Sequence, residues 1–420
     1  MRYVRVSLAM IFATFLYTGG VGCVWLFFSD SNSDRPGEWP ELGEKPTISV
    51  PIEDLQALAD ANNEFAFKLN RSLIQEGGNV AFSPLSIAMV LDMLYNGAAG
   101  ETKEAMAATR SLPPWDTERI NEANRGLLTH FLWADPDVRL AIANSLWLGS
   151  GPIQRSFVDN VSTFYNANVQ AVDFKSPNTP ALINAWVKEK TNGRITELRP
   201  QYASNTAAYA VNTVYFNGSW RNEFKESNTR KAAFATSLAS TVNVDMMSGV
   251  HDLMYATSDD WQAVGMPYGN GALAMCIVLP STASSLKGFC DTLDAKAWDA
   301  LQMKLEPVRV TLSLPRFKLE TEPNLTPTLS NLGMKSAFHP WADFSNLSPV
   351  PTWINAFDHK VFIEVTEHGT EAAAATGGGG GFCSAGPRTA TMTVDRPFFF
   401  AIGDVTTGAI LFMGAVNDPS

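Results

Sequence analysis

Histidine and cysteine, the residue types that most often carry catalysis or bind metals, are few and scattered in this sequence. None of the five histidines is spaced from another as metal ligands are, and none is beside a conspicuous serine or cysteine nucleophile. No HExxH, G-x-S-x-G or P-loop motif is present. The four cysteines form neither a CxxC pair nor a disulfide framework. These residues are His130, His251, His339, His359 and His368, and Cys23, Cys276, Cys290 and Cys383.

This spacing argues against an enzyme and predicts neither a cofactor nor a metal site. An exported hydrolase whose catalytic groups meet only in the folded chain is kept as the alternative from a different class. Cys276 and Cys290, in a predicted strand and a predicted helix, are expected to be buried thiols or a disulfide.

One segment near the C-terminus has a composition that predicts another kind of function. After a strand pattern that ends near Thr366, the chain contains four alanines (Ala372–Ala375) and five glycines (Gly377–Gly381). Strong strand patterns flank this segment on both sides, so we expect residues 369–395 to form a long exposed excursion from a β framework. Such excursions are more often functional than accidental, although a plain solvated linker is the alternative.

Hydrophobic patterns place helices mainly early and strands mainly late in the chain. Ser83 precedes Pro84 as an N-cap hydroxyl, and Gly193 follows a helix as a left-handed cap. The glycines at 269 and 271 precede a strand and predict a hairpin turn. The pattern favours an α+β fold with antiparallel sheets. Helices are predicted over 59–74, from residue 84, and over 155–165 and 179–192; strands are predicted over 209–216, 273–279, 308–314, 361–366, 398–402 and 409–416.

Composition and charge exclude several partners. The 420 residues are 45% hydrophobic and 17% charged, so the chain has ample apolar surface for a core. Lysine and arginine number 31 and aspartate and glutamate 42, a net charge of −11. This charge repels a phosphate backbone, and no nucleic-acid partner is expected.

The N-terminal segment predicts export. Arg2 and Arg5 precede an uncharged, largely apolar run over residues 6–29, which is long enough to span a membrane. We therefore predict a signal peptide or membrane anchor over 1–29, an extended linker over 30–58 and a folded domain over 59–420. The domain is expected outside the cell or at its surface, with membrane contact only through the N-terminal segment. Lipidation at Cys23 is a further alternative.

Nine short motifs follow one another along the chain, at residues 79–88, 96–102, 211–220, 314–319, 332–334, 342–345, 359–365, 395–400 and 407–414. In sequence, order and spacing they resemble those of the serpins, a family of suicide-substrate protease inhibitors. The resemblance extends from about Asp60 to Pro419, and the shared order and spacing of the motifs make chance implausible.

The resemblance implies an α+β serpin fold with three β-sheets, eight or nine helices and an exposed reactive-centre loop near the C-terminus. It implies inhibition without enzymatic activity or a cofactor, by a monomer whose partner is a serine protease, or else a cysteine protease. The protease would cleave the loop and form an acyl-enzyme, and the loop would then insert as a strand into the main sheet. The alternative within the family is a non-inhibitory serpin that is a cleaved substrate or a binding protein.

The resemblance also assigns hinge and gate residues. A strand that enters a packed sheet needs small, strand-compatible side chains at its leading end, and the hinge sequence meets this requirement. A hydrogen-bonding shutter under the parting strands and a breach tryptophan where insertion begins are implied as well; the alternative is a core polar network without a switching role. The hinge residues are Glu367, Gly369, Thr370, Glu371, Ala372, Ala373, Ala374 and Ala375; the shutter residues are Ser83, Ser86, Asn212 and His359, and the breach residue is Trp220.

The family register places the scissile bond between Cys383 and Ser384, sixteen residues after Glu367. A small, uncharged cysteine suits the S1 pocket of elastase-like or subtilisin-like proteases. A slip of one residue in the glycine run would instead present Phe382 to a chymotrypsin-like protease, and Arg388 offers a trypsin site further along. The five glycines depart from the family pattern and, by slowing insertion, would favour the substrate alternative.

Overall fold

The computed structural model describes residues 44–74, 78–149, 151–198, 201–237, 240–370 and 388–420. The chain divides into two units, Met1–Glu41 and Leu42–Ser420, and all described residues lie in the second. Within these residues no helix is long and apolar enough to cross a membrane. The segment 1–29 and the bond between Cys383 and Ser384 lie outside the described residues.

The described residues form nine α-helices, and four of them (α1, α2, α5 and α6) are those that the sequence predicts. Ser83 caps α2 by accepting a hydrogen bond from the backbone N–H of Ser86, as the sequence predicts. Helix α1 begins at Ile52, earlier than the predicted start at residue 59. The helices of the described residues are α1 Ile52–Leu73, α2 Pro84–Gly97, α3 Gly100–Arg110, α4 Thr117–Leu132, α5 Arg155–Tyr165, α6 Thr179–Lys190, α7 Leu286–Thr292, α8 Ala295–Gln302 and α9 Leu325–Leu329.

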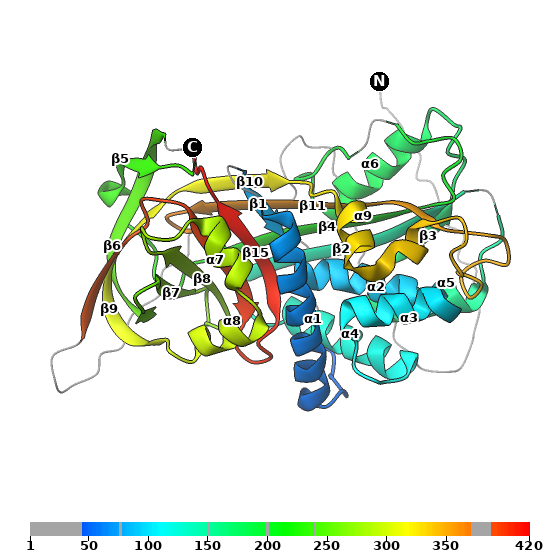
Figure 1. Ribbon diagram of the computed structural model, residues 1–420, viewed down its shortest axis with the longest axis horizontal. Helices are drawn as coiled ribbons and strands as arrows, with labels where there is room; N and C mark the ends of the chain where they lie inside the picture. The colour runs from blue at the N-terminus through cyan, green and yellow to red at the C-terminus, as the bar shows by residue number, and fades with distance from the viewer. Residues whose placement is uncertain (1–43, 75–77, 150, 199–200, 238–239, 371–387) are drawn as a thin grey trace, which may run out of the picture. The chain divides into compact units, whose positions relative to one another are not determined.

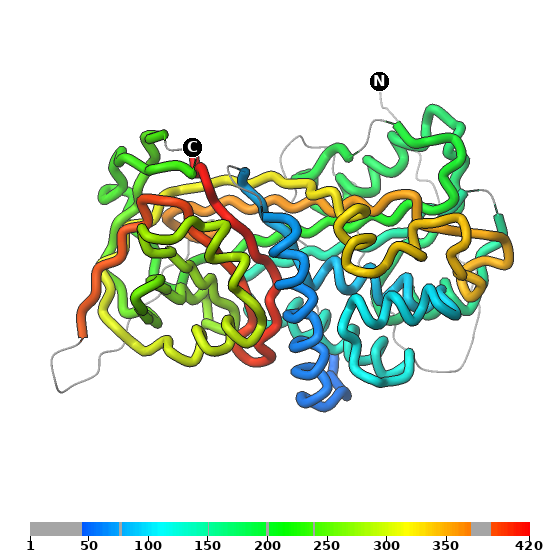
Figure 2. The backbone as a smooth tube through the Cα atoms, viewed as in Figure 1, coloured from blue at the N-terminus to red at the C-terminus, as the bar shows by residue number. Residues whose placement is uncertain are grey.

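A six-stranded sheet positions the candidate site. Its order is β10-β11-β12-β4-β2-β3, and β4 also pairs directly with β11 in parallel. Figure 2 shows these two segments, far apart in sequence, running side by side. The strands are β10 Phe317–Thr321, β11 Ile354–Thr366, β12 Gly369–Thr370, β4 Ala208–Ser219, β2 Val138–Leu148 and β3 Asn168–Ala171.

A nine-stranded network contains the remaining strands. The expected three sheets are found as two hydrogen-bonded networks, because the 17-residue β6 pairs with β5, β9 and β7 in turn and joins two sheets into one. The order is β1-β15-β14-β8-β7-β6-β9-β13, with β5 on β6. The strands are β1 Val80–Phe82, β5 Arg230–Ala235, β6 Thr241–Thr257, β7 Trp261–Pro267, β8 Leu273–Pro280, β9 Glu306–Pro315, β13 Thr389–Thr393, β14 Phe398–Asp404 and β15 Ile410–Val416.

Helices α6 and α2 cover opposite faces of β4 and β11 (Figure 1). Side chains alternate along a strand, so alternate residues of β4 enter different apolar layers. Tyr209 and Val211 pack with Ile183 and Val187 of α6, whereas Ala210 and Val214 belong to the main core with α2. Both faces of β4 are therefore buried.

The predicted excursion over 369–395 is wrong at both of its ends. Gly369 and Thr370 are buried and form β12, and residues 389–393 form β13, which pairs in parallel with β9. Neither segment has a strongly apolar pattern of its own, and both are strands because neighbouring strands offer them hydrogen-bonding edges. Residues 371–387 lie outside the described part of the chain.

Candidate functional site

Two residues of the predicted hinge, Gly369 and Thr370, lie inside the six-stranded sheet. Gly369 and Thr370 pair antiparallel with Thr366 and Val365 of β11 on one side, and with Ser219 and Gly218 of β4 on the other. The backbones of β12 and β4 approach closely here, since a Cβ on Gly369 would overlap the carbonyl oxygen of Gly218. The φ angle of Gly369 is +147°, which side chains rarely allow, so this position requires glycine.

Aromatic side chains hold Thr370 in place. Its hydroxyl lies 2.7 Å from Oη of Tyr268, and both residues are fully buried. Tyr268 stacks on the indole of Trp220 at a ring distance of 4.5 Å. Trp220 in turn donates from Nε1 to the carbonyl of Thr366, at 3.0 Å. Trp220, the predicted breach residue, thus lies where β12 enters the sheet.

Glu367 anchors the residues just before β12. Its carboxylate accepts hydrogen bonds from Nε and Nη2 of Arg316, at 2.8 and 2.6 Å, and one from the hydroxyl of Thr229. Burial pushes the pKa of Glu367 upward, but the Arg316 and Thr229 bonds outweigh it and hold this pKa below its usual value. The anchor is therefore charged at neutral pH.

His368, the next residue along the chain, forms a second anchor. Its Nδ1 lies 2.9 Å from Oε2 of Glu223, and its Nε2 lies 3.0 Å from Oε1 of Glu226. These hydrogen bonds to Glu223 and Glu226 raise the pKa of His368 above the usual histidine value. When the ring is protonated, each of its two N–H groups can donate to one of these carboxylates.

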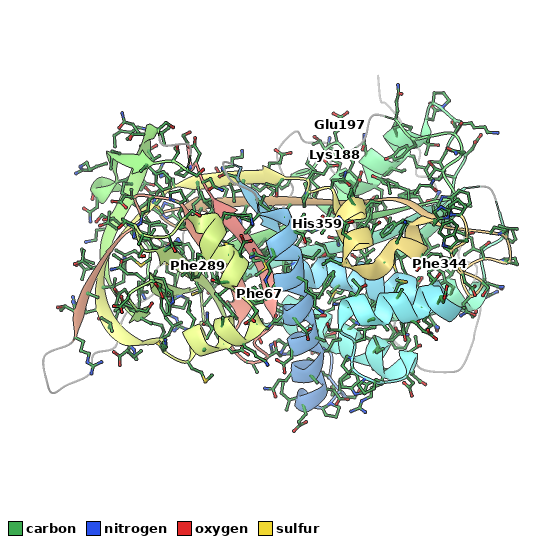
Figure 3. All side chains as sticks on the ribbon, in the orientation of Figure 1. Phe67, Lys188, Glu197, Phe289, Phe344 and His359 are labelled. Carbon is green, nitrogen blue, oxygen red and sulfur yellow. The ribbon has the colours of Figure 1, made fainter. Side chains whose placement is uncertain are left out.

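The four predicted shutter residues meet in one buried cluster on the α2 face of the sheet. The backbone N–H of Ser83 donates to Nε2 of His359 at 2.9 Å, and Nδ1 of His359 lies 2.6 Å from Oδ1 of Asn212. Nδ2 of Asn212 donates to Oγ of Ser86 and, at 2.7 Å, to Oδ1 of Asn144 on β2. Figure 3 labels His359 among the strands between α6 and α2.

The protonation state of His359 follows from these bonds. Burial lowers the pKa of His359 to about 3, so the ring is neutral at physiological pH. Because Nε2 accepts from a backbone N–H, the proton is on Nδ1, which donates to Asn212. The hydrogen bond from His359 to Asn212 joins β11 to β4. A gating role for the cluster stays a prediction, as does the alternative of a polar network that only stabilises the core.

The sequence did not identify the partners that hold the hinge. Tyr268 directly follows β7, Arg316 lies between β9 and β10, and Glu223 and Glu226 lie in the segment after Trp220. Arg316 stands inside a motif quoted above, and a charge in a mainly apolar strand region was its only signal. The other hinge and bait residues lie outside the described part of the chain: Glu371, Ala372, Ala373, Ala374, Ala375, Phe382, Cys383 and Ser384.

Cys276 and Cys290 are free, buried thiols, which decides between the two expectations for them. Burial raises the pKa of each to about 12. Neither is suited to nucleophilic chemistry in the folded protein.

The fold and this geometry define a class of protein, an α+β domain in which the start of an internal segment enters the central sheet between two parallel strands. The chain belongs to the serpin family. The family model described as "Serpin (serine protease inhibitor)" matches residues 60–419.

Known proteins resemble the chain over nearly all of its length. An uncharacterized serpin-like protein of Methanosarcina acetivorans is 34% identical over 395 residues, covering 90% of this chain and 91% of the relative. The native thermophilic serpin tengpin has a TM-score of 0.78 at 28% identity, covering 90% and 96% of the two chains. Human thyroxine-binding globulin, in a complex with thyroxine, has a TM-score of 0.80 at 26% identity, covering 87% of this chain and 100% of the other.

Proposed function

We propose that the protein inhibits serine proteases outside the cytoplasm, of elastase-, subtilisin- or chymotrypsin-like specificity. The protease cleaves the segment after β12, becomes trapped as an acyl-enzyme, and is carried along as the freed segment inserts between β11 and β4. The predicted export segment supports an extracellular or cell-surface location. The protein acts as a monomer, without a cofactor and without turnover of its own.

The observation that carries this proposal is the position of β12. Its two residues already lie between β11 and β4 and are antiparallel to both strands. Farther along the two strands, over residues 208–215 of β4 and 354–362 of β11, they pair directly and in parallel. Parallel pairing is slightly less stable per residue than antiparallel pairing. A strand that continues β12 would replace one parallel pairing with two antiparallel pairings, so insertion is favoured by backbone hydrogen bonding.

The length of the seam between β4 and β11 supports the predicted scissile bond. Continued in the register of Thr370, the new strand would reach Ala208, the first residue of β4, at residue 380. Cys383 would then lie just beyond the ends of β4 and β11. A protease attached to Cys383 would by then have been carried along the full length of the pairing between these two strands, which we call the seam. No proline interrupts residues 369–386, so every position can join the ladder.

The same register gives the glycine run a physical reason. Residue 377 would come level with Val211 and Asp358, whose side chains face α6 in a layer that already contains Tyr209 and Trp147. Glycine adds no side chain to this filled layer. The five glycines cost about 2.5 to 5 kcal/mol relative to alanine, against about ten new ladder hydrogen bonds at about 1 kcal/mol each. Insertion stays downhill, and its rate decides between inhibitor and substrate.

A panel of serine proteases tests the proposal. We expect a covalent complex stable in SDS with an elastase- or subtilisin-like protease, and a released peptide that begins at Ser384. The matched variant Cys383→Arg should redirect the complex to trypsin, whose pocket requires a cation. Cleavage without a complex would support the substrate alternative, and turnover of an ester by the protein alone would support the hydrolase.

A further inference from the structure

A second side-chain bond joins β4 to β11, on the face opposite the shutter. Oη of Tyr209 donates a hydrogen bond to Oδ2 of Asp358 at 2.6 Å. Tyr209 is fully buried and Asp358 is 3% exposed. Asp358 pairs with Val211 in the sheet, so the bond runs diagonally across the seam.

The surroundings make this bond strong. Ile183 and Val187 of α6 cover the layer, which is largely apolar. A carboxylate in such a layer is unfavourable unless it accepts hydrogen bonds. Burial, followed by the Asp358 charge, raises the pKa of Tyr209 far above its usual value, so the phenol keeps its proton and donates. The ring of Tyr202, 4.7 Å from that of Tyr209, restricts its position further.

Neighbouring residues of β11 therefore fasten β4 from both faces. Asp358 binds Tyr209 on the α6 face, and His359 binds Asn212 on the α2 face. A strand inserted between β4 and β11 would separate them by about 9.6 Å, twice the usual distance between neighbouring strands. Both hydrogen bonds are too short to span that distance, so they must break when β4 and β11 separate.

We propose that Tyr209 and Asp358 form a clasp, defined as this one hydrogen bond, that holds the seam shut on the α6 face and limits how fast it opens. The clasp rests on the proposed function for its purpose, because a seam that opens too easily would insert the segment before any protease has cleaved it. Both residues are positioning residues, and neither contacts the protease.

The test compares Tyr209→Phe with Tyr215→Phe in uncleaved protein. Tyr215 is a matched control, because it is another buried tyrosine of β4 and its hydroxyl accepts from Asn217 on the same strand. We expect backbone amide exchange over 208–213 and 356–360 to rise roughly tenfold or more in Tyr209→Phe, the loss expected for a buried bond to a charged group. Tyr215→Phe should change it much less. Equal exchange in the two variants would overturn the clasp.

A double variant guards against the unpaired carboxylate that Tyr209→Phe leaves behind. Tyr209→Phe combined with Asp358→Val replaces the pair with apolar side chains, which often restores stability. The clasp predicts that seam exchange stays high although the protein melts no earlier than Tyr209→Phe alone, and that insertion after cleavage is faster than in wild type. Seam exchange that returns to the wild-type rate would contradict it.

The proposed function is tested separately, by the thermal stability of the wild-type protein before and after cleavage. A wild-type protein that gains no thermal stability on cleavage contradicts insertion. The exchange comparison uses only uncleaved protein and therefore judges the clasp alone.

Discussion

The hydroxyl of Thr370 lies 2.7 Å from Oη of Tyr268, in the interior of the sheet and ahead of any cleavage. Thr370, the predicted leading hinge residue, is thus already buried in the sheet of the uncleaved protein. Tyr268 in turn stacks on Trp220, so two aromatic rings pack together at the point where β12 enters the sheet. In the proposed mechanism, insertion would continue the existing strand β12 and would not have to nucleate a new strand.

Replacing Thr370 with arginine should abolish inhibition. A long charged side chain has no place in the buried position between β11 and β4, and would expel the hinge from the sheet. We expect cleavage of Thr370→Arg without a covalent complex, measured by the ratio of complex to cleaved protein on SDS gels. Because Thr370 is buried before cleavage, the substitution should also lower the free energy of unfolding of the uncleaved protein by roughly 1 to 3 kcal/mol, as loss of a buried contact does. The uncleaved variant should therefore melt at a lower temperature.

The control for this variant is Thr311→Arg, the same change at an exposed position of β9. It should trap protease as wild type does. A Thr370→Arg protein that forms complex at the wild-type ratio would show that the hinge is assigned wrongly.

The His368 anchor should make the uncleaved protein more stable in mild acid. Glu223 and Glu226 raise the pKa of His368 above 6.5, so its contribution is fully present below that value and is lost as the pH rises through the raised pKa. Glu367, Arg316 and Asp245 are the other charges near this hinge segment. The melting temperature of wild type minus that of His368→Gln should be largest near pH 6 and should shrink toward pH 9. A difference in melting temperature that does not vary with pH would show that the bonds of His368 to Glu223 and Glu226 do not stabilise the protein.

His359 should have the opposite effect. Its pKa is about 3 in the folded protein and about 6.5 when unfolded, so between these values the unfolded chain binds one more proton. Stability should therefore fall as the pH falls below about 6.5, by up to about 1.4 kcal/mol per pH unit. Guanidinium unfolding of His359→Gln should lack this contribution. The same slope in the variant and in wild type would mean that His359 is protonated when folded.

The buried thiols give a chemical test of the core. Without a reductant, alkylation at pH 8 should leave Cys276 and Cys290 unmodified in the folded protein, because both are buried and burial raises the pKa of each to about 12. After unfolding in guanidinium, both should be modified, as peptide mass spectrometry would report. Modification that requires a reductant even after unfolding would reveal a disulfide.

The sequence predicts the elements of this fold better than the contacts of its site. Helix α5 has the predicted bounds, and Ser83 caps α2, because caps and apolar spacing are local signals. Tyr268 and Thr370 are 102 residues apart in the chain, and no local pattern indicates that they meet. The burial of Thr370 likewise depends on the gap between two other strands and not on its own neighbours.

The clasp between Tyr209 and Asp358 could not be predicted from the sequence either. Asp358 stands in a strand beside the motif residue His359, and its charge alone would favour an exposed position. Only the pairing of β4 with β11 brings Tyr209 within hydrogen-bonding distance. A buried charge of this kind can be recognised from the sequence as unusual, but its partner cannot.

The central claim is that the cleaved segment becomes a strand between β11 and β4, and the melting temperature before and after a single cleavage tests it most directly. About ten new ladder bonds, less the cost of the glycines, leave roughly 5 kcal/mol or more, enough to raise the melting temperature by about 10 °C. The account predicts that rise for protein cleaved only between Cys383 and Ser384. An unchanged melting curve after this cleavage would contradict it.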